Sequence, residues 1–336
     1  MLMQPYLDSV SPCAYRVTKY CYSRKPGNCP ACKALTTPGD MTAQKHGGGY
    51  FFVISNLAAL SVAYYVTVPA YETYFKPNLV SGANPLLDTL ANFTAPFLYD
   101  PRLDHLLNKC YLSSLIGFYS MTIIGTVLDC FPSLFLKYKT QGNRSYFTVK
   151  EWLEANVVAI FNLGIASWFV TLPCCYLWKS LWGTSFDVRG NAELKNFDVK
   201  IALFHLAVIF LVVDTWFYWT HRLLHVHPLY NWIHKFHHRF KAPTAVASVY
   251  ANPVEFTVGN HLGVALGPCL VNPHPYVAYF WFFLALFSTG GSHSGYYFFG
   301  AEGHDIHHEK FNYNFGVGGF MDYLCGTKYE VAKKKK

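Results

Sequence analysis

Four long apolar runs limit the folds that this chain can adopt. They cover residues 50–70, 110–134, 157–177 and 201–219, and the only charged side chains within them are Asp129 and Asp214. A helix of about 20 apolar residues is long enough to cross a bilayer. Only 14% of the residues are charged, against about 25% in soluble domains. We therefore predict an all-α fold, an integral membrane helical bundle with about four transmembrane helices.

The loops between the runs predict the orientation of the bundle. The N-terminal segment and the loop 135–152 are rich in Lys and Arg relative to acids, and such segments stay in the cytosol. Four spans then place the chain after residue 220 and both termini in the cytosol, and the glycosylation triplet at Asn92 in the lumen. Alternatively, the third and fourth runs form a shallow hairpin. The net charge of +8 is interpreted as loop charge, so no nucleic-acid partner is expected.

These patterns divide the chain into four parts. We predict a flexible cytosolic tail (1–48), transmembrane helices (49–220), a cytosolic histidine-rich helical metal domain (221–330) and a basic tail (331–336). The basic tail carries Lys333 and Lys334 at the spacing of a dilysine retrieval signal of the endoplasmic reticulum. The alternative is a solvated tail near anionic lipid.

Four cysteines stand in the N-terminal tail. They are free thiols in a mobile segment or, alternatively, ligands of a zinc ion, since two of them form a CxxC. The residues concerned are Cys13, Cys21, Cys29 and Cys32.

Twelve of the fifteen histidines lie between His221 and His308 in a repeated pattern. An HxxxH motif is followed by two HxxHH motifs, with one isolated histidine before the last. Residues three and four apart share a helix face, so each motif is expected to point its imidazoles toward one polar pocket. The candidate metal ligands are His221, His225, His234, His237, His238, His293, His304, His307 and His308.

Nine imidazoles exceed one tetrahedral site and fit two metal ions with open positions. Neutral imidazole binds iron, zinc, copper and nickel, whereas a structural zinc site usually includes cysteine. An all-histidine site at a membrane face favours two iron ions that activate dioxygen, with a lipid substrate entering from the bilayer. The alternative from another class is a membrane metal-binding or transport protein. It fits less well, because transport places polar residues inside the spans.

Acidic residues near the motifs are candidates to accept the second N–H of a ligand imidazole. Asp214 precedes His221 by seven residues on the same helix face. Alternatively, it caps a helix or pairs with Arg222. Glu255 lies in NPVE between the second and third motifs. Asp305 and Glu309 flank histidines of the third motif.

The other histidines near the motifs have different expectations. His261 is a candidate to complete a coordination shell, and His205 is interpreted as a core residue inside the fourth run. His227 and His274 each precede a proline and are not expected to be ligands.

The motifs together resemble the fatty acid hydroxylase and sterol desaturase superfamily. DTWFYWTHRLLH, IHKFHHRFKAPT, NPVE, HSGY, HDIHH, NYNFG and MDYLCGT occur in the family's order, over about residues 200–330. The HRLLH and IHKFHH motifs, followed by FKAPT, are similar to the branch of 4-methylsterol oxidases and cholesterol hydroxylases. Nothing before about residue 200 carries the resemblance.

The resemblance implies a four-helix membrane anchor and two iron ions held by the nine histidines. It implies oxidation of a lipid C–H bond by dioxygen, with NAD(P)H electrons delivered by a cytochrome b-type donor and its reductase. The expected protein is a membrane-bound non-haem di-iron oxidoreductase of the endoplasmic reticulum, most like a 4-methylsterol oxidase. The alternative is a fatty-acyl or sphingolipid hydroxylase or desaturase of the same superfamily.

A few positions depart from the family pattern. Asn252 stands where the family often has a histidine before the proline, and two aromatic residues near the end are replaced by Met and Cys. No second histidine stands four residues from His293, where Thr289 occurs. That ligand is either missing or supplied by His261.

Overall fold

The structure, a computed structural model, describes residues 48–70, 101–140, 148–167 and 197–329, with the single positions 73, 171, 174 and 181. The chain divides into two units, Met1–Gly49 and Tyr50–Lys336, and the second is treated below. The predicted N-terminal tail with its cysteines, the glycosylation triplet and the terminal lysines fall outside the described residues. The described part is helical and contains no β-strand, in agreement with the all-α prediction.

Four long helices dominate the described part. They are α3 (Gly48–Tyr65), α7 (Pro101–Asp129), α11 (Val199–Leu224) and α14 (Pro275–His293). The shorter elements are α4 (Thr67–Ala70), α8 (Pro132–Phe135), η4 (Leu136–Tyr138), α9 (Val149–Ile160), η6 (Phe161–Ala166), α12 (Leu229–Trp232), η9 (His234–Arg239), η10 (Ala245–Val249), η11 (Glu255–His261), α13 (Leu262–Val271), η12 (Tyr297–Phe299), α15 (Ala301–Lys310) and α16 (Phe320–Leu324).

Local sequence signals explain where several of these helices begin. Thr148 and Glu151 form a capping box at the start of α9, which satisfies N–H groups that have no partner within the helix. Asp198 accepts the N–H groups of residues 200 and 201 and starts α11. His274 accepts the N–H of Tyr276 ahead of the proline that opens α14.

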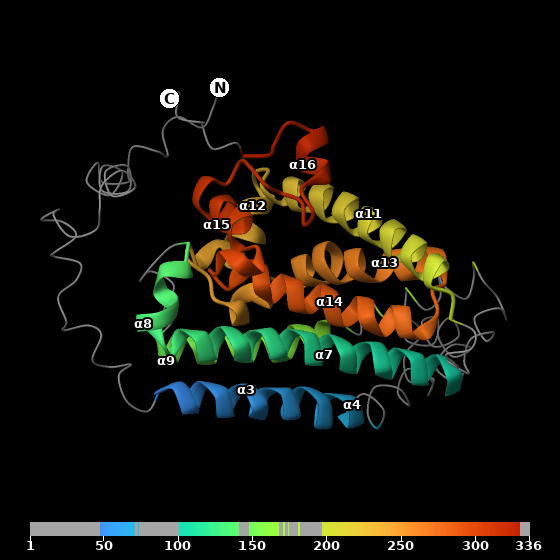
Figure 1. Ribbon diagram of the computed structural model, residues 1–336, viewed down its shortest axis with the longest axis horizontal. Helices are drawn as coiled ribbons and strands as arrows, with labels where there is room; N and C mark the ends of the chain where they lie inside the picture. The colour runs from blue at the N-terminus through green and yellow to red at the C-terminus, as the bar shows by residue number, and fades with distance from the viewer. Residues whose placement is uncertain are drawn as a thin grey trace, which may run out of the picture. The chain divides into compact units, whose positions relative to one another are not determined.

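The long helices pack in layers. In Figure 1, α7 lies between α3 and α14, and α11 lies over α13. Hydrogen bonds join α3 to α7, from Tyr111 to Ala63 and from Asn56 to Thr126. The largest buried cluster joins α3, α7 and α9 to η10, with Leu115, Phe118 and Tyr119 of α7 fully buried in it. The histidine-bearing segments follow α11 and α14, so the packing of these two helices sets their position.

Among the described residues, two helices are long and apolar enough to cross a membrane. They are Leu106–Asp129 within α7, with mean hydropathy 1.5, and Val199–Leu224, with mean hydropathy 2.0. They match the second and fourth apolar runs. The apolar helix of the first run is shorter, Phe52–Tyr65, and the third run is described only in part. The four-span arrangement therefore stays a prediction.

A close approach of α7 and α14 depends on Gly117. A Cβ atom at this position would lie 2.3 Å from the carbonyl oxygen of Phe283, a backbone atom that cannot move independently of α14. We expect Gly117→Ala to force the helices apart and to lower the free energy of unfolding by about 1–3 kcal/mol. The change is measured as a fall in the thermal midpoint of the purified protein in detergent.

Gly125 provides the matched control on the same helix. A Cβ atom there would meet the Cβ of Ala245 at 3.5 Å, an ordinary contact. Gly125→Ala is expected to keep the midpoint or raise it slightly, because alanine favours helix over glycine. Equal midpoints for both variants would mean that α7 and α14 are not in such close contact.

Candidate metal centre

Four segments bring the nine candidate histidines together. The end of α11 supplies His221 and its C-cap residue, His225, and α14 ends at His293. The other six come from η9 and α15. All nine side chains are buried or half-buried.

The nine histidines form two groups. Within each group, one ring nitrogen of every histidine lies within 4.8 Å of those of the other members. Neighbouring Nε2 atoms are 2.8–3.3 Å apart. The five-histidine group consists of His221, His225, His234, His238 and His307, and the four-histidine group of His237, His293, His304 and His308.

Each HxxHH motif divides between the two groups, which differs from the expectation that it points to one pocket. In α15, His304 and His308 belong to the four-histidine group, and His307 belongs to the other. Consecutive helical residues point about 100° apart, so the last two histidines of the motif diverge. The motif in η9 divides in the same way. A single HxxHH thus serves two adjacent sites.

The donor atoms fit metal ions. Two nitrogens about 2.1 Å from one ion and at right angles to each other are about 3 Å apart, and the observed Nε2 separations have this size. Among the described residues, neither group includes a cysteine or a carboxylate. All-imidazole sites suit iron, zinc, copper and nickel.

Hydrogen bonds at Nδ1 orient four of the rings. Backbone carbonyls accept these bonds at 2.8–3.1 Å. A proton on Nδ1 leaves the Nε2 lone pair directed into the group, which is the tautomer that a metal ligand requires. The pairs are His221 with Phe315, His237 with Tyr250, His293 with Thr289 and His307 with Tyr313.

Burial keeps these imidazoles neutral. It lowers the pKa of His225 to about 2, of His293 to about 3 and of His237 to about 4. Repulsion from neighbouring histidines adds to the effect at His225 and His293. The same causes lower the pKa of His234, His238, His304, His307 and His308. Neutral imidazole is the ligand form, so both groups are competent to bind metal at neutral pH.

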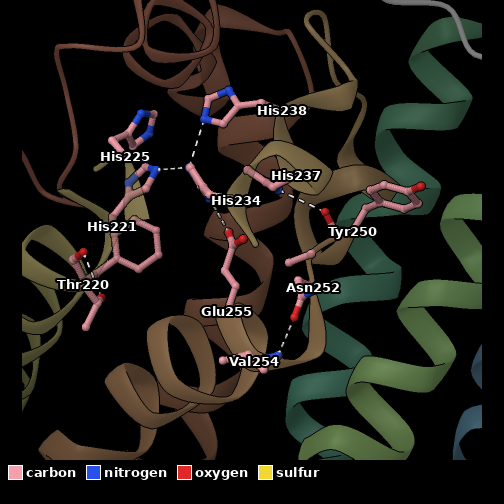
Figure 2. Close-up of polar contacts among 12 residues, drawn as sticks. Thr220, His221, His225, His234, His237, His238, Tyr250, Asn252, Val254 and Glu255 are labelled. Atoms are coloured by element: carbon pink, nitrogen blue, oxygen red, sulfur yellow. Dashed lines mark hydrogen bonds and ion pairs between the residues drawn. The ribbon is translucent and has the colours of Figure 1, made fainter. Parts of the chain in front are cut away.

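Glu255 contacts a histidine of the five-histidine group. Its Oε1 accepts a hydrogen bond from Nδ1 of His234 at 2.9 Å (Figure 2). Burial raises the pKa of Glu255 well above its usual range. Asn252, where the family often has histidine, accepts the N–H of Val254 at 3.0 Å and shapes the turn before Glu255.

The other acidic candidates have different partners. Asp214 accepts the backbone N–H groups of Gly318 and Met321 at 2.7 and 2.9 Å. It fastens the C-terminal loop to α11 instead of orienting an imidazole or pairing with the neighbouring arginine. Asp305 accepts a hydrogen bond from Thr140, which ties α15 to the segment after η4. Glu309 is exposed and pairs with the adjacent lysine.

Asp322 is a residue of the site that the sequence analysis did not single out. Its carboxylate accepts the N–H groups of Phe315 and Gly316 at 2.8 and 2.7 Å and the hydroxyl of Thr327 at 2.7 Å. The carbonyl of Phe315 holds His221, and its ring packs against two further rings of the five-histidine group. The available signal was its place in MDYLCGT.

We expect Asp322→Ala to loosen the loop 311–327 over the five-histidine group. The variant leaves two buried N–H groups without an acceptor, at a cost of about 1–3 kcal/mol each. Hydrogen exchange should rise in this loop and stay unchanged in α7. The control is Glu302→Ala, which removes an exposed carboxylate from α15. Unchanged exchange in the loop would refute the role of Asp322.

His261 belongs to neither group, so the structure does not use it to complete a coordination shell. It ends η11 and lines a cavity between α7, α13 and α14. His205 lies within α11, His227 is exposed, and His274 caps α14. None of these three belongs to either group.

The described part of the chain is thus helical, with two candidate membrane-spanning helices and two adjacent, buried all-histidine groups. The sequence model of the fatty acid hydroxylase family matches residues 206–327, which include all nine histidines. A methylsterol monooxygenase of Aspergillus fumigatus is 32% identical over 224 residues, covering 60% of this chain and 72% of the relative. The chain therefore belongs to the fatty acid hydroxylase and sterol desaturase superfamily.

Other relatives carry different names. Fatty acid hydroxylase domain-containing protein 2 of Macaca fascicularis is 44% identical over 200 residues, 58% of this chain and 58% of the relative. A very-long-chain aldehyde decarbonylase of rice, Oryza sativa subsp. indica, is 33% identical over 164 residues, 44% of this chain and 60% of the relative. No solved structure matches. Membership of this superfamily, together with the apolar helices, supports a membrane-bound lipid hydroxylase or oxidase.

Proposed function

We propose that this protein is a membrane-bound non-haem di-iron oxidoreductase that uses dioxygen to oxidise a C–H bond of a lipid. The observation that carries the proposal is the pair of adjacent groups, five and four histidines, at the end of a candidate membrane-spanning helix. His221, His225, His234, His238 and His307 would hold one iron, and His237, His293, His304 and His308 the other. Two irons, when bound, would activate dioxygen, and dioxygen would supply the oxidising equivalents that an unactivated C–H bond requires.

The surrounding residues orient the imidazole rings of the site and keep them neutral. Backbone carbonyls and Glu255 fix the ring orientations, and burial keeps the imidazoles unprotonated. The loop held by Asp214 and Asp322 covers the five-histidine group and limits access of water from that side. Rings that are oriented in advance need no reorganisation when the metal binds.

We further propose a sterol of the 4-methylsterol class as the substrate. Support comes from the Aspergillus relative named methylsterol monooxygenase and from a second relative, of Dictyostelium discoideum, that is 30% identical over 82% of its length. The second candidate is an enzyme that acts on aliphatic chains. The rice relative named for very-long-chain aldehydes favours it. Lipid profiling of a deletion strain distinguishes the two, since one predicts accumulated methylsterols and the other a loss of hydroxylated or unsaturated chains.

The proposed partners are a cytochrome b-type electron donor and its NAD(P)H reductase. Lys235 and Lys241 are exposed close to the η9 histidines, and positive charge there would steer an acidic partner to the site. The proposed location is the endoplasmic reticulum membrane with cytosolic termini. Protease protection of tags at either end of the chain tests this orientation.

The decisive experiment is metal analysis of the detergent-purified chain, paired with dioxygen consumption in the presence of a reductase system and a total lipid extract. Two irons per chain and consumption that depends on lipid are expected. Folded protein with little bound metal of any kind would overturn the proposal. If the purified chain contains zinc, the metal is replaced by iron before activity is measured, because purification can exchange metals of similar affinity.

A further inference from the structure

A cavity lies beside the four-histidine group. It is bordered by α7, η6, α13 and α14, and none of the described residues that line it is Asp, Glu, Lys or Arg. Two of its wall residues are close to the group: the carbonyl of Thr289 holds His293, and Val249 precedes Tyr250, whose carbonyl holds His237. The cavity therefore ends directly behind the residues that orient two of the four histidines.

Most hydroxyl groups on the cavity wall already donate a hydrogen bond within the protein. The hydroxyls of Ser114, Ser167, Thr171 and Thr289 each donate to the carbonyl four residues earlier in their own helix. The hydroxyl of Tyr111 donates to a carbonyl of α3. These five side chains present mainly their carbon atoms to a ligand, so they add little polarity to the cavity.

Asn260 and His261 are the exception. Both line the cavity, and neither side chain makes a hydrogen bond to any described residue. The Nδ1 atom of His261 is fully enclosed and has no partner. Burial lowers the pKa of His261 to about 4, so its imidazole is neutral at physiological pH. An enclosed polar group without a partner is unfavourable, so the Nδ1 atom of His261 indicates a place where a ligand supplies the missing bond. Asn260 lies next to it on the cavity wall.

We propose that the cavity receives the hydroxyl-bearing end of an uncharged lipid alcohol and that His261, with Asn260, hydrogen-bonds its hydroxyl group. The cavity volume of about 100 Å³ admits this end of the lipid and not its whole body. The two residues determine specificity for the lipid, and this assignment rests on the proposed function as a lipid oxidase. A neutral imidazole offers one donor and one acceptor, and an amide offers both, which matches a hydroxyl. A carboxylate or phosphate head group would need a cation, and the described part of the cavity wall supplies none.

The test measures lipid binding to the full-length purified chain in detergent. The probes are tritiated cholesterol and tritiated oleyl alcohol. Each is competed with its counterpart lacking only the hydroxyl, cholest-5-ene or 9-octadecene, and with oleate. At least one alcohol should bind saturably, about tenfold more tightly than its deoxy counterpart and more tightly than oleate. His261→Leu should abolish this preference, and His261→Gln, which retains a donor and an acceptor, should preserve much of it.

Two further variants make the result specific. Ala265→Leu adds volume to the cavity wall and should weaken binding of both the alcohol and its deoxy counterpart. His227→Leu removes an exposed histidine outside the cavity and should change nothing. Absence of saturable alcohol binding, equal affinity for the deoxy counterpart, or an unchanged preference in His261→Leu would each overturn the proposal.

Metal content separates this inference from the proposed function. If the chain binds two irons but shows no preference for an alcohol, the assignment of His261 fails and the proposed function stands. If it binds the alcohol through His261 but holds no iron, the assignment stands and the proposed function fails.

Discussion

Replacing His308 by alanine is expected to remove the metal of the four-histidine group and to abolish turnover. His308 is buried, and its Nε2 is 3.0 Å from that of His304 in the same group. Removal of a residue that only supports a metal ligand typically costs 10- to 100-fold in affinity or activity. Loss of the ligand itself should therefore cost more, on the order of a thousandfold or greater. Turnover is measured as lipid-dependent dioxygen consumption.

The two groups should lose metal separately. His308→Ala should retain about one metal ion per chain, and so should His238→Ala, which removes a ligand from the five-histidine group. The control is His227→Ala, since His227 is exposed and belongs to neither group. It should keep both ions and full turnover. Loss of both ions in His308→Ala would contradict the division of the histidines into two groups. Full activity in His308→Ala, or loss of activity in His227→Ala, would contradict the assignment of the ligands.

The histidines of the site could be found from the sequence because ligand spacing is local. An HxxxH or HxxHH motif on a helix indicates clustered imidazoles wherever it occurs. How the motifs divide was not predictable in the same way. His307 and His308 are adjacent in sequence but belong to different groups, and this assignment depends on how α15 is positioned against η9 and α14. Such packing depends on residues far apart in the chain.

The groups that orient the rings were harder to predict for a physical reason. Four of the Nδ1 partners are backbone carbonyls, and every residue has a carbonyl, so they leave no signature in the sequence. For Asp214, which shares a helix face with His221, the sequence left open whether it orients an imidazole, caps a helix or pairs with Arg222. It instead accepts N–H groups from a loop more than 100 residues away, a contact that helical periodicity does not contain.

The apolar runs predicted helices better than they predicted helix lengths. The second and fourth runs correspond to helices long enough to span a membrane. In the first run, α3 ends at Tyr65 although the apolar residues continue to Ala70. Pro69 lies four residues after Tyr65, and a proline ring clashes with the carbonyl at this spacing. Hydrophobicity alone predicts one span over residues 50–70, because it does not detect the end of α3 at Tyr65.

The second large effect is expected at Glu255. Its carboxylate accepts the Nδ1 proton of His234 at 2.9 Å, and both side chains are buried. Burial alone favours the neutral acid, but a bound metal cation favours the ionised carboxylate. The negative charge then strengthens imidazole as a ligand and offsets part of the positive charge of the ion. Glu255→Gln keeps the shape and one acceptor but removes the charge. We expect metal affinity of the five-histidine group to fall by about 10- to 100-fold, measured by competition with a chelator, with turnover falling in parallel at limiting iron.

Glu309 provides the matched control, because it lies beside His308 in sequence but is exposed and pairs only with Lys310 among the described residues. Glu309→Gln should leave metal affinity unchanged, since an exposed ion pair contributes at most about 1 kcal/mol. Added iron should partly restore turnover of Glu255→Gln, whereas His308→Ala should not recover, because it lacks a ligand. If Glu255→Gln bound metal as tightly as the unmodified chain, the carboxylate would have no part in metal binding by the five-histidine group. If excess iron failed to restore its turnover, the loss of turnover would not arise from weaker metal binding. The contrast separates a residue that tunes a ligand from one that is a ligand.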